Sequence, residues 1–242
     1  MLDLRLNSSI LQSIINKVNF FVLALFIGTV GQSQDSTTTN PDPERFRSEI
    51  DQFIHSDQEY MPTDSVILFI GSSSIRLWDL DQYFPNYYGL NRGFGGAHIS
   101  DMLHYFELIV SPYPIKGVVF YCGDNDIASG KTPDRVYNGF LRIYTKIIHL
   151  FPRVKFYYIP IKPSISRWDK WELMNQTNHK ILILSKWNTA LYYVDTATPM
   201  LQLEGIPNPG LFVDDELHLN TAGYSLWSQI LKNRIHHTFN PK

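Results

Sequence analysis

The sequence of 242 residues contains a single cysteine, Cys122, and has almost no excess of charge. One cysteine cannot form a disulfide within the chain or supply a cysteine-rich metal site. Lys and Arg number 21 against 23 Asp and Glu, so the chain lacks the basic surplus that is typical of nucleic-acid-binding proteins. We therefore expect no nucleic-acid partner. Among eight histidines only His236 and His237 are adjacent, and no His-x-x-x-His spacing occurs, so we expect no metal site. Packing is therefore expected to supply most of the stability.

The sequence also lacks an apolar run that comfortably reaches the about 20 residues of a membrane span. The best candidate, residues 19–31, is apolar, follows Lys17, and leads into small and polar residues. This pattern is typical of the hydrophobic region of a secretory signal. We expect residues 1–33 to be a signal peptide, no stable membrane span, and a secreted or periplasmic protein, with an uncleaved anchor as the less favoured alternative.

The domain organisation follows from a change in composition after this segment. Residues 34–43 are polar, contain prolines and show no apolar periodicity, so they are interpreted as a linker. The remaining residues, 44–242, are enough for one domain with one core. Nothing in the sequence indicates an oligomeric state.

Short apolar runs then alternate with helical patterns. The runs predict strands at 66–70, 87–91, 118–122, 154–161 and 190–195. Helical spacing and capping residues predict helices over 44–57, from Thr132 to about 151, over about 168–187, and from Thr221 onward. Nearly continuous apolar strands separated by helices indicate an α/β protein whose parallel sheet is covered on both faces.

Polar residues follow the strands at the ends where open parallel sheets bind ligands. GSSS occupies 71–74, RGFGGAH occupies 92–98, and GDND occupies 123–126, each after a predicted strand. DDELHLN at 214–220 precedes the last helix. We expect these segments to bring hydroxyls, glycines, an asparagine and an Asp/His pair to one edge of the sheet, which is a combination suited to acyl transfer.

The chemistry explains why these residue types belong together. A serine hydroxyl becomes a good nucleophile when an imidazole accepts its proton. The imidazole of His218 needs an acceptor that fixes its tautomer, and Asp215 can provide one from three residues before it. The oxyanion of the tetrahedral intermediate needs donors, which backbone N–H groups and the amide of Asn125 can supply.

These four blocks, in this order, resemble those of the SGNH hydrolases, also called GDSL-type esterases and lipases. The resemblance spans residues 71–218 and implies a flavodoxin-like, three-layer α/β/α sandwich of about five parallel strands. RGFGG at 92–96 and IKPSISRW at 161–168 resemble bacterial platelet-activating-factor acetylhydrolase-like esterases in particular. Two positions depart from the family pattern, since Ser72 and Ala97 stand where the family often has aspartate.

The resemblance also implies roles for individual residues. The catalytic residues would be Ser73, Asp215 and His218. The oxyanion hole would be formed by the N–H groups of Ser73 and Gly96 and by the side chain of Asn125.

Several alternatives remain open at this stage. By composition, Ser72 or Ser74 could be the nucleophile, and Asp214 could replace Asp215. His98, near Asp101, is a rival base, and Asn220 or Thr221 could cap the last helix. Arg167 and Trp168 could form a substrate rim, although tryptophans at helical spacing are more often packed than functional.

The sequence thus predicts a serine esterase that forms an acyl-enzyme on Ser73 and requires no cofactor. The expected substrate is a small-molecule or carbohydrate ester with a short acyl group such as acetyl. The alternatives are a noncatalytic carbohydrate- or anion-binding protein on the same fold, and an acyltransferase or thioesterase with the same triad.

Overall fold

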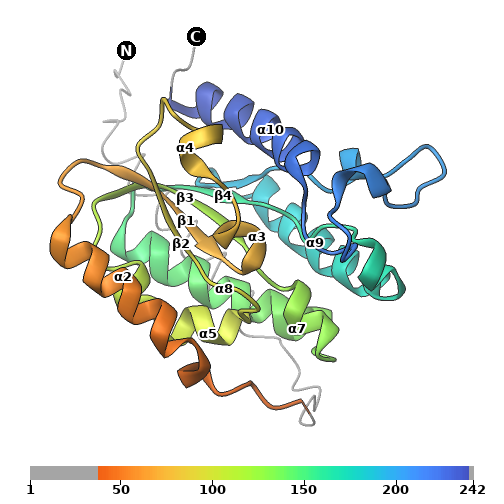
Figure 1. Ribbon diagram of the computed structural model, residues 1–242, viewed down its shortest axis with the longest axis horizontal. Helices are drawn as coiled ribbons and strands as arrows, with labels where there is room; N and C mark the ends of the chain where they lie inside the picture. The colour runs from red at the N-terminus through yellow and green to blue at the C-terminus, as the bar shows by residue number, and fades with distance from the viewer. Residues whose placement is uncertain (1–37, 240–242) are drawn as a thin grey trace, which may run out of the picture. The chain divides into compact units, whose positions relative to one another are not determined.

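The computed structural model describes residues 38–239 (Figure 1). The expected signal peptide, 1–33, and the first part of the expected linker, 34–37, lie outside these residues. The predicted first helix is present as a short 3₁₀ turn, η1 (Pro43–Phe46), followed by α2 (Arg47–Glu59). Asp42 caps this turn, because its side chain accepts a hydrogen bond from the N–H of Glu44 at 3.0 Å.

Five parallel strands form one sheet in the order β2-β1-β3-β4-β5. This is the flavodoxin-like order, in which the winding of the chain reverses between β1 and β3. The predicted α/β/α sandwich with a parallel sheet is confirmed. The strands are β1 (Val66–Gly71), β2 (Gly89–Gly93), β3 (Ile115–Tyr121), β4 (Lys155–Tyr158) and β5 (Leu191–Tyr193).

The edge strand β2 is shifted along the sequence from its expected position, whereas β3 begins three residues earlier and β4 ends three residues earlier than expected. Strand β2 begins and ends two residues later than the predicted 87–91, so Arg92 lies in the strand and not in the following loop. Arg92 is buried there, where it pairs with Asp57 and donates a hydrogen bond to the Tyr113 hydroxyl at 2.7 Å. Strand prediction relies on apolar residues, and Arg92 is a polar residue that can be buried because Asp57 and Tyr113 satisfy its guanidinium. This explains why the predicted end of the strand falls before Arg92.

The helices pack on both faces of the sheet. The long helices match the predicted ones, whereas the short helices have four to six residues and are too short to show a helical period. The long helices are α8 (Pro133–Leu150), α9 (Trp171–Lys186) and α10 (Thr221–Phe239); the short ones are α3 (Ser73–Arg76), α4 (Leu80–Tyr83), α5 (Ile99–His104), α6 (Phe106–Ile109) and α7 (Asp124–Ala128).

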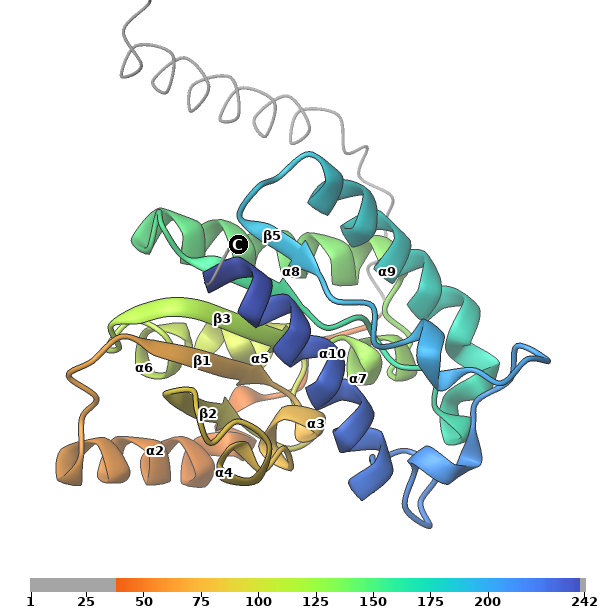
Figure 2. The ribbon, with the colours of Figure 1, turned by 90° about the horizontal axis from the view of Figure 1, so that it is seen from above.

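Alternation along β1 divides the core into two halves. Leu68 and Ile70 point to the side covered by α8, while Ile67 and Phe69 point to the side covered by α10. Figures 1 and 2 show α10 and α8 on opposite sides of the sheet. Since successive side chains of a strand point to opposite faces, a strand buried on both faces has to be apolar throughout.

Aromatic packing anchors α10, the helix that follows the Asp/His segment. Trp78 and Trp227 are buried with their ring centroids 5.6 Å apart, and the indole N–H of Trp78 donates to Ser228 Oγ at 2.9 Å. Truncation of a buried tryptophan typically costs ~3–5 kcal/mol, so this contact anchors the N-terminal half of α10. Within residues 38–239, no helix is both long enough and apolar enough to cross a membrane.

The turn after β1 provides a test of this packing. Gly71 has φ of 151°, and a Cβ at this position would lie 1.9 Å from the carbonyl oxygen of Tyr121. We predict that Gly71→Ala lowers the free energy of unfolding by at least ~3 kcal/mol, measured by urea denaturation, because backbone atoms cannot move aside.

Gly205→Ala is the matched control. Gly205 also has positive φ, 76°, but nothing lies within 4 Å of an added Cβ. Only the backbone strain of roughly 1–2 kcal/mol is expected there. Equal losses in the two variants would contradict the assigned role of the Gly71 contact.

Candidate active site

Three neighbouring strands end in register at one edge of the sheet. Gly71 of β1 is paired with Gly93 of β2 on one side and with Tyr121 of β3 on the other. The N–H of Phe94 donates to Gly71 at 3.0 Å, and the N–H of Ser72 donates to Tyr121 at 3.0 Å. The loops after these strands therefore start side by side at the point between β1 and β3 where sheets of this topology bind ligands.

Ser73 is the first residue of α3 and comes directly after this turn. Its Oγ lies 2.9 Å from Nε2 of His218. Ser72 and Ser74 are fully buried. Ser72 Oγ has no hydrogen-bond partner among the described residues, and Ser74 Oγ accepts a hydrogen bond from Lys162. Of the three serines, Ser73 is the one placed against an imidazole.

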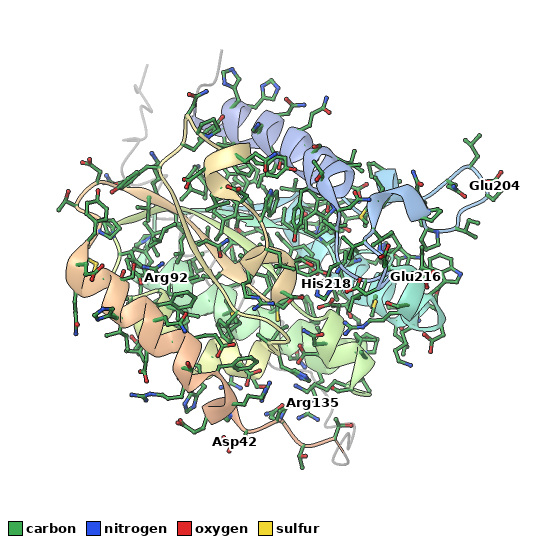
Figure 3. All side chains as sticks on the ribbon, in the orientation of Figure 1. Asp42, Arg92, Arg135, Glu204, Glu216 and His218 are labelled. Carbon is green, nitrogen blue, oxygen red and sulfur yellow. The ribbon has the colours of Figure 1, made fainter. Side chains whose placement is uncertain are left out.

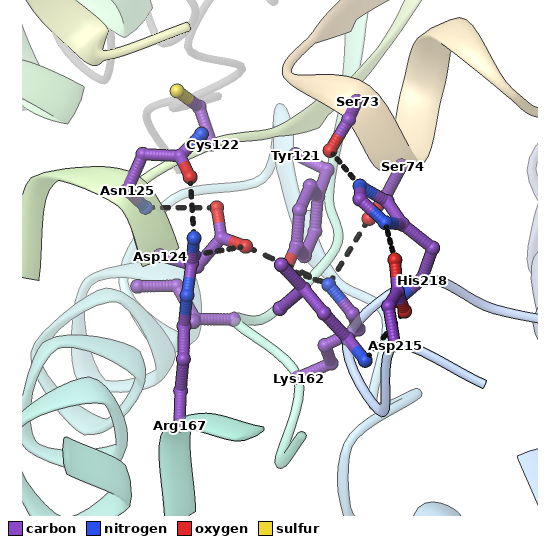
Figure 4. A network of polar contacts seen from close by, with 12 residues as sticks. Ser73, Ser74, Tyr121, Cys122, Asp124, Asn125, Lys162, Arg167, Asp215 and His218 are labelled. Atoms are coloured by element: carbon purple, nitrogen blue, oxygen red, sulfur yellow. Dashed lines mark hydrogen bonds and ion pairs between the residues drawn. The ribbon is translucent and has the colours of Figure 1, made fainter. Parts of the chain in front are cut away.

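Asp215 and His218 lie in a tight turn before α10, where Figure 3 labels His218 and its neighbour Glu216. One carboxylate oxygen of Asp215 accepts the N–H groups of Leu217 at 2.9 Å and His218 at 2.8 Å. The other oxygen is 2.5 Å from His218 Nδ1. The same carboxylate thus closes the turn and orients the ring toward Ser73 (Figure 4), and Asp215 occupies this place rather than Asp214.

Glu216, at the centre of the turn, has a left-handed backbone with φ of 56°. A residue with a Cβ pays roughly 1–2 kcal/mol for this conformation. Hydrogen bonds hold it, since its N–H donates to Val213 at 2.9 Å and its carbonyl accepts from Ser166 at 3.2 Å. The position of the Asp215 side chain relative to that of His218 therefore depends on the left-handed backbone of Glu216. A glutamate at this position gives no indication of that conformation in the sequence.

Asn220 fixes the other end of the turn. Its Oδ1 accepts the N–H groups of Ala222 at 2.9 Å and Gly223 at 3.1 Å, so Asn220 caps α10. Its Nδ2 donates to the carbonyls of Gly210 and Phe212, both at 2.9 Å. The cap thereby attaches the turn to the anchored helix.

Hydrogen bonding sets the charge of Asp215. Partial burial alone would raise the pKa of this carboxyl, but the hydrogen bonds from the His218 ring and from two backbone N–H groups outweigh it and lower the pKa to about 2. Asp215 is therefore ionised at neutral pH, where it can stabilise a protonated imidazole.

Asn125 is hydrogen-bonded to Ala97, the residue that follows Gly96. The side-chain Nδ2 of Asn125, on α7, donates to the carbonyl of Ala97 at 3.0 Å and so attaches α7 to the loop after β2. Gly96 is exposed in this loop with φ of 76°, a conformation that favours glycine. The two predicted donor residues of the oxyanion hole are thus tied to each other.

Arg167 and Trp168 lie in η2 (Ile165–Lys170), a 3₁₀ segment between β4 and α9. Arg167 donates from Nη2 to Asn125 Oδ1 at 3.0 Å, and its Nη1 is 3.1 Å from Asp124 Oδ2. The half-buried Trp168 ring stacks on Trp171, with centroids 6.0 Å apart. Arg167 therefore contacts the polar network, while Trp168 packs against the first residue of α9.

His98, the rival base, has different neighbours. It is buried at the start of α5, where its N–H donates to Asp101 at 2.8 Å. Its ring Nδ1 is 3.5 Å from a carboxylate oxygen of Asp126. His98 therefore lies beside the buried carboxylates of Asp101 and Asp126. The hydrogen bond to Ser73 comes from His218.

Lys162 is a buried residue that sequence reasoning did not single out. Its Nζ donates to Ser74 Oγ at 3.1 Å and to the Tyr121 hydroxyl at 3.0 Å, and lies 3.6 Å from Asp124 Oδ2. Burial lowers the pKa of its amine, and the nearby Asp124 charge opposes this shift. Lys162 follows β4 at the same edge of the sheet, so the strand-end rule could have found it.

Within residues 38–239, no group of three or more His, Cys, Asp or Glu side chains is arranged to hold a metal ion.

Solved structures share this fold at low sequence identity. A GDSL-like lipase from Bacteroides thetaiotaomicron superposes with a TM-score of 0.67 at 18% identity, covering 81% of this chain and 98% of that one. A candidate acylhydrolase from Bacteroides fragilis gives 0.69 at 18% identity, covering 83% and 100%. An acetyl-xylooligosaccharide esterase from Geobacillus gives 0.57 at 15% identity, covering 72% and 95%.

Sequence comparison identifies the family. No match was found among curated proteins. Residues 76–226 match the model of the GDSL-like Lipase/Acylhydrolase family, a segment that contains Gly96, Asn125, Asp215 and His218. The chain therefore belongs to the GDSL-like lipase/acylhydrolase family of ester-hydrolysing enzymes.

Proposed function

We propose that this enzyme hydrolyses a short-chain carboxylic ester through an acyl-enzyme on Ser73. The observation that carries the proposal is the series of hydrogen bonds from Asp215 through His218 to Ser73, at 2.5 Å and 2.9 Å. The family match begins three residues after Ser73, so the choice of nucleophile rests on this geometry.

In the acylation step, Ser73 Oγ attacks the ester carbonyl while His218 Nε2 accepts the hydroxyl proton. Asp215 holds the ring through Nδ1 and stabilises the imidazolium that forms. His218 then donates the proton to the oxygen of the leaving alcohol as the C–O bond breaks. The acyl group remains on Ser73.

Deacylation repeats the step with water as the nucleophile. His218 Nε2 accepts a proton from water as its oxygen attacks the acyl carbonyl, and returns the proton to Ser73 Oγ when the acid leaves. In both steps the oxyanion would be held by the N–H groups of Ser73 and Gly96 and by the amide of Asn125. One such donor is typically worth ~2.7–4 kcal/mol of transition-state stabilisation.

Two observations support a short acyl group on a carbohydrate or small alcohol. One of the solved structures with this fold is an acetyl-xylooligosaccharide esterase. In this chain the stacked rings of Trp168 and Trp171 follow Arg167, which contacts Asn125, and aromatic faces of this kind can pack against a sugar. The apolar run at 19–31 supports action outside the cytoplasm, which we propose as the location.

The nucleophile is tested by labelling the purified protein with a fluorophosphonate and assaying p-nitrophenyl acetate. We predict an adduct on Ser73, located by peptide mass, and a loss of at least about 10,000-fold in kcat for Ser73→Ala, because Ser73 supplies the hydroxyl that is hydrogen-bonded to the imidazole of His218.

Ser72→Ala is the matched control for this experiment. Ser72 Oγ is buried without a partner among the described residues, so its removal is expected to leave labelling and turnover within about 3-fold of the wild type. Labelling that survives Ser73→Ala, or a wild type that neither labels nor turns over, would rule out this mechanism.

The charge of Asp215 gives a prediction for pH. Its folded-state pKa of about 2 lies below the unfolded value of about 3.9, so its contribution to stability is present above about pH 4 and is lost as pH falls toward 2. In His218→Ala we expect the midpoint of the Asp215 carboxyl, followed by ¹³C NMR, to rise toward the ordinary value. An unchanged midpoint would show that the ring does not set the charge of Asp215.

A further inference from the structure

Arg167 joins two consecutive residues of α7. Its Nη2 donates to Asn125 Oδ1 at 3.0 Å, and its Nη1 is 3.1 Å from Asp124 Oδ2 (Figure 4). The side chain is 19% exposed and that of Asp124 is 4% exposed, so the ion pair is largely shielded from water. The guanidinium is thus directed into the site and is engaged by protein groups.

The two partners of Asn125 fix the orientation of its amide group. A guanidinium has only donors, and it meets the oxygen of the amide; a carbonyl has only an acceptor, and that of Ala97 meets the nitrogen. A 180° rotation of the amide would place nitrogen against the guanidinium and oxygen against the carbonyl, so both contacts would become repulsive. Both partners therefore favour one orientation, in which Nδ2 keeps a second hydrogen for another acceptor.

The same network reaches the turn that carries Ser73. Asp124 Oδ2 also lies 3.6 Å from Lys162 Nζ, which donates to the hydroxyl of Ser74, the neighbour of Ser73. Two cationic side chains, Lys162 and Arg167, therefore lie against one carboxylate beside the proposed oxyanion donors. A buried positive charge that is fixed in advance favours the negative charge that develops in acyl transfer.

We propose that Arg167 is a positioning residue of the oxyanion hole: it holds the amide of Asn125 with Nδ2 available to the substrate oxyanion. The proposal rests on the ester hydrolysis at Ser73 proposed above. It assigns Arg167 a role different from that of a rim residue for an anionic substrate, because its two terminal nitrogens are engaged by Asn125 and Asp124.

The first test is a double-mutant cycle with a neutral ester, p-nitrophenyl acetate. Arg167→Met keeps much of the side-chain volume and removes the donors. It should lower kcat about 10- to 100-fold, less than the about 100- to 1,000-fold typical for loss of a whole oxyanion donor, with KM changed less than about 2-fold. In an Asn125→Ala background the same change should cost less than about 2-fold, because no amide remains to be positioned.

Two further variants sharpen the cycle. Arg167→Lys keeps the charge but has no planar fork to meet both Asn125 and Asp124, so it should recover only part of kcat. Arg135→Met, which removes a guanidinium that bonds Thr38 and Asn40, should leave kcat unchanged. Equal losses from Arg167→Met in both backgrounds, or a rise confined to the KM of an anionic ester, would overturn the proposal.

A second readout does not depend on activity. The NMR signal of the Asn125 side-chain amide can be assigned by its loss in Asn125→Ala. In Arg167→Met this signal should shift and report increased motion, whereas in Arg135→Met it should not change. An unchanged signal in Arg167→Met would overturn the positioning role, and a wild type without labelling or turnover would overturn only the proposed function.

Discussion

The close contact between Gly71 and the carbonyl oxygen of Tyr121 is the constraint on which the site depends. A side chain at residue 71 would separate β1 from β3 at the level where both strands end. Ser73 begins α3 two residues after this contact, and Asn125 lies on α7, which follows the end of β3. The geometry of the proposed catalytic residues therefore depends on the sheet edge where the winding reverses, and not on any one loop.

The polar network beside Ser73 contains charged side chains that are buried, and burying a charge is unfavourable unless it is paired. Lys162 and Asp124 are almost completely shielded from water, and removal of one member of such a pair typically costs ~3–5 kcal/mol because it leaves the other unpaired. Arg167 pairs with Asp124 as well, and the hydroxyls of Ser74 and Tyr121 accept hydrogen bonds from Lys162. The network is fixed before substrate arrives, and preorganised groups of this kind stabilise transition-state charge most effectively.

Sequence reasoning predicted the residues whose chemistry is readable from spacing and missed those defined by distant contacts. Apolar runs located the sheet, and strand ends located the segments 71–74 and 123–126. The choice of Ser73 and Asn125 within these segments came from the resemblance to the family. Arg167 reaches Asn125 across 42 positions of sequence, and no local pattern indicates such a contact. Ser72 donates its backbone N–H to the carbonyl of Tyr121, a contact that does not depend on its side chain, and its hydroxyl is buried. Among residues 38–239 its side chain makes no hydrogen bond that accounts for serine in place of aspartate.

The central claim is that Ser73, His218 and Asp215 act as one proton-transfer unit held at this edge. The most direct test is the proton NMR signal of the His218 Nδ1–H, which a short hydrogen bond to a carboxylate moves far downfield of ordinary amide protons. We predict that the signal is present in the wild type, persists in Ser73→Ala and disappears in Asp215→Asn. A wild-type protein without this signal, or a signal that survives Asp215→Asn, would contradict the account.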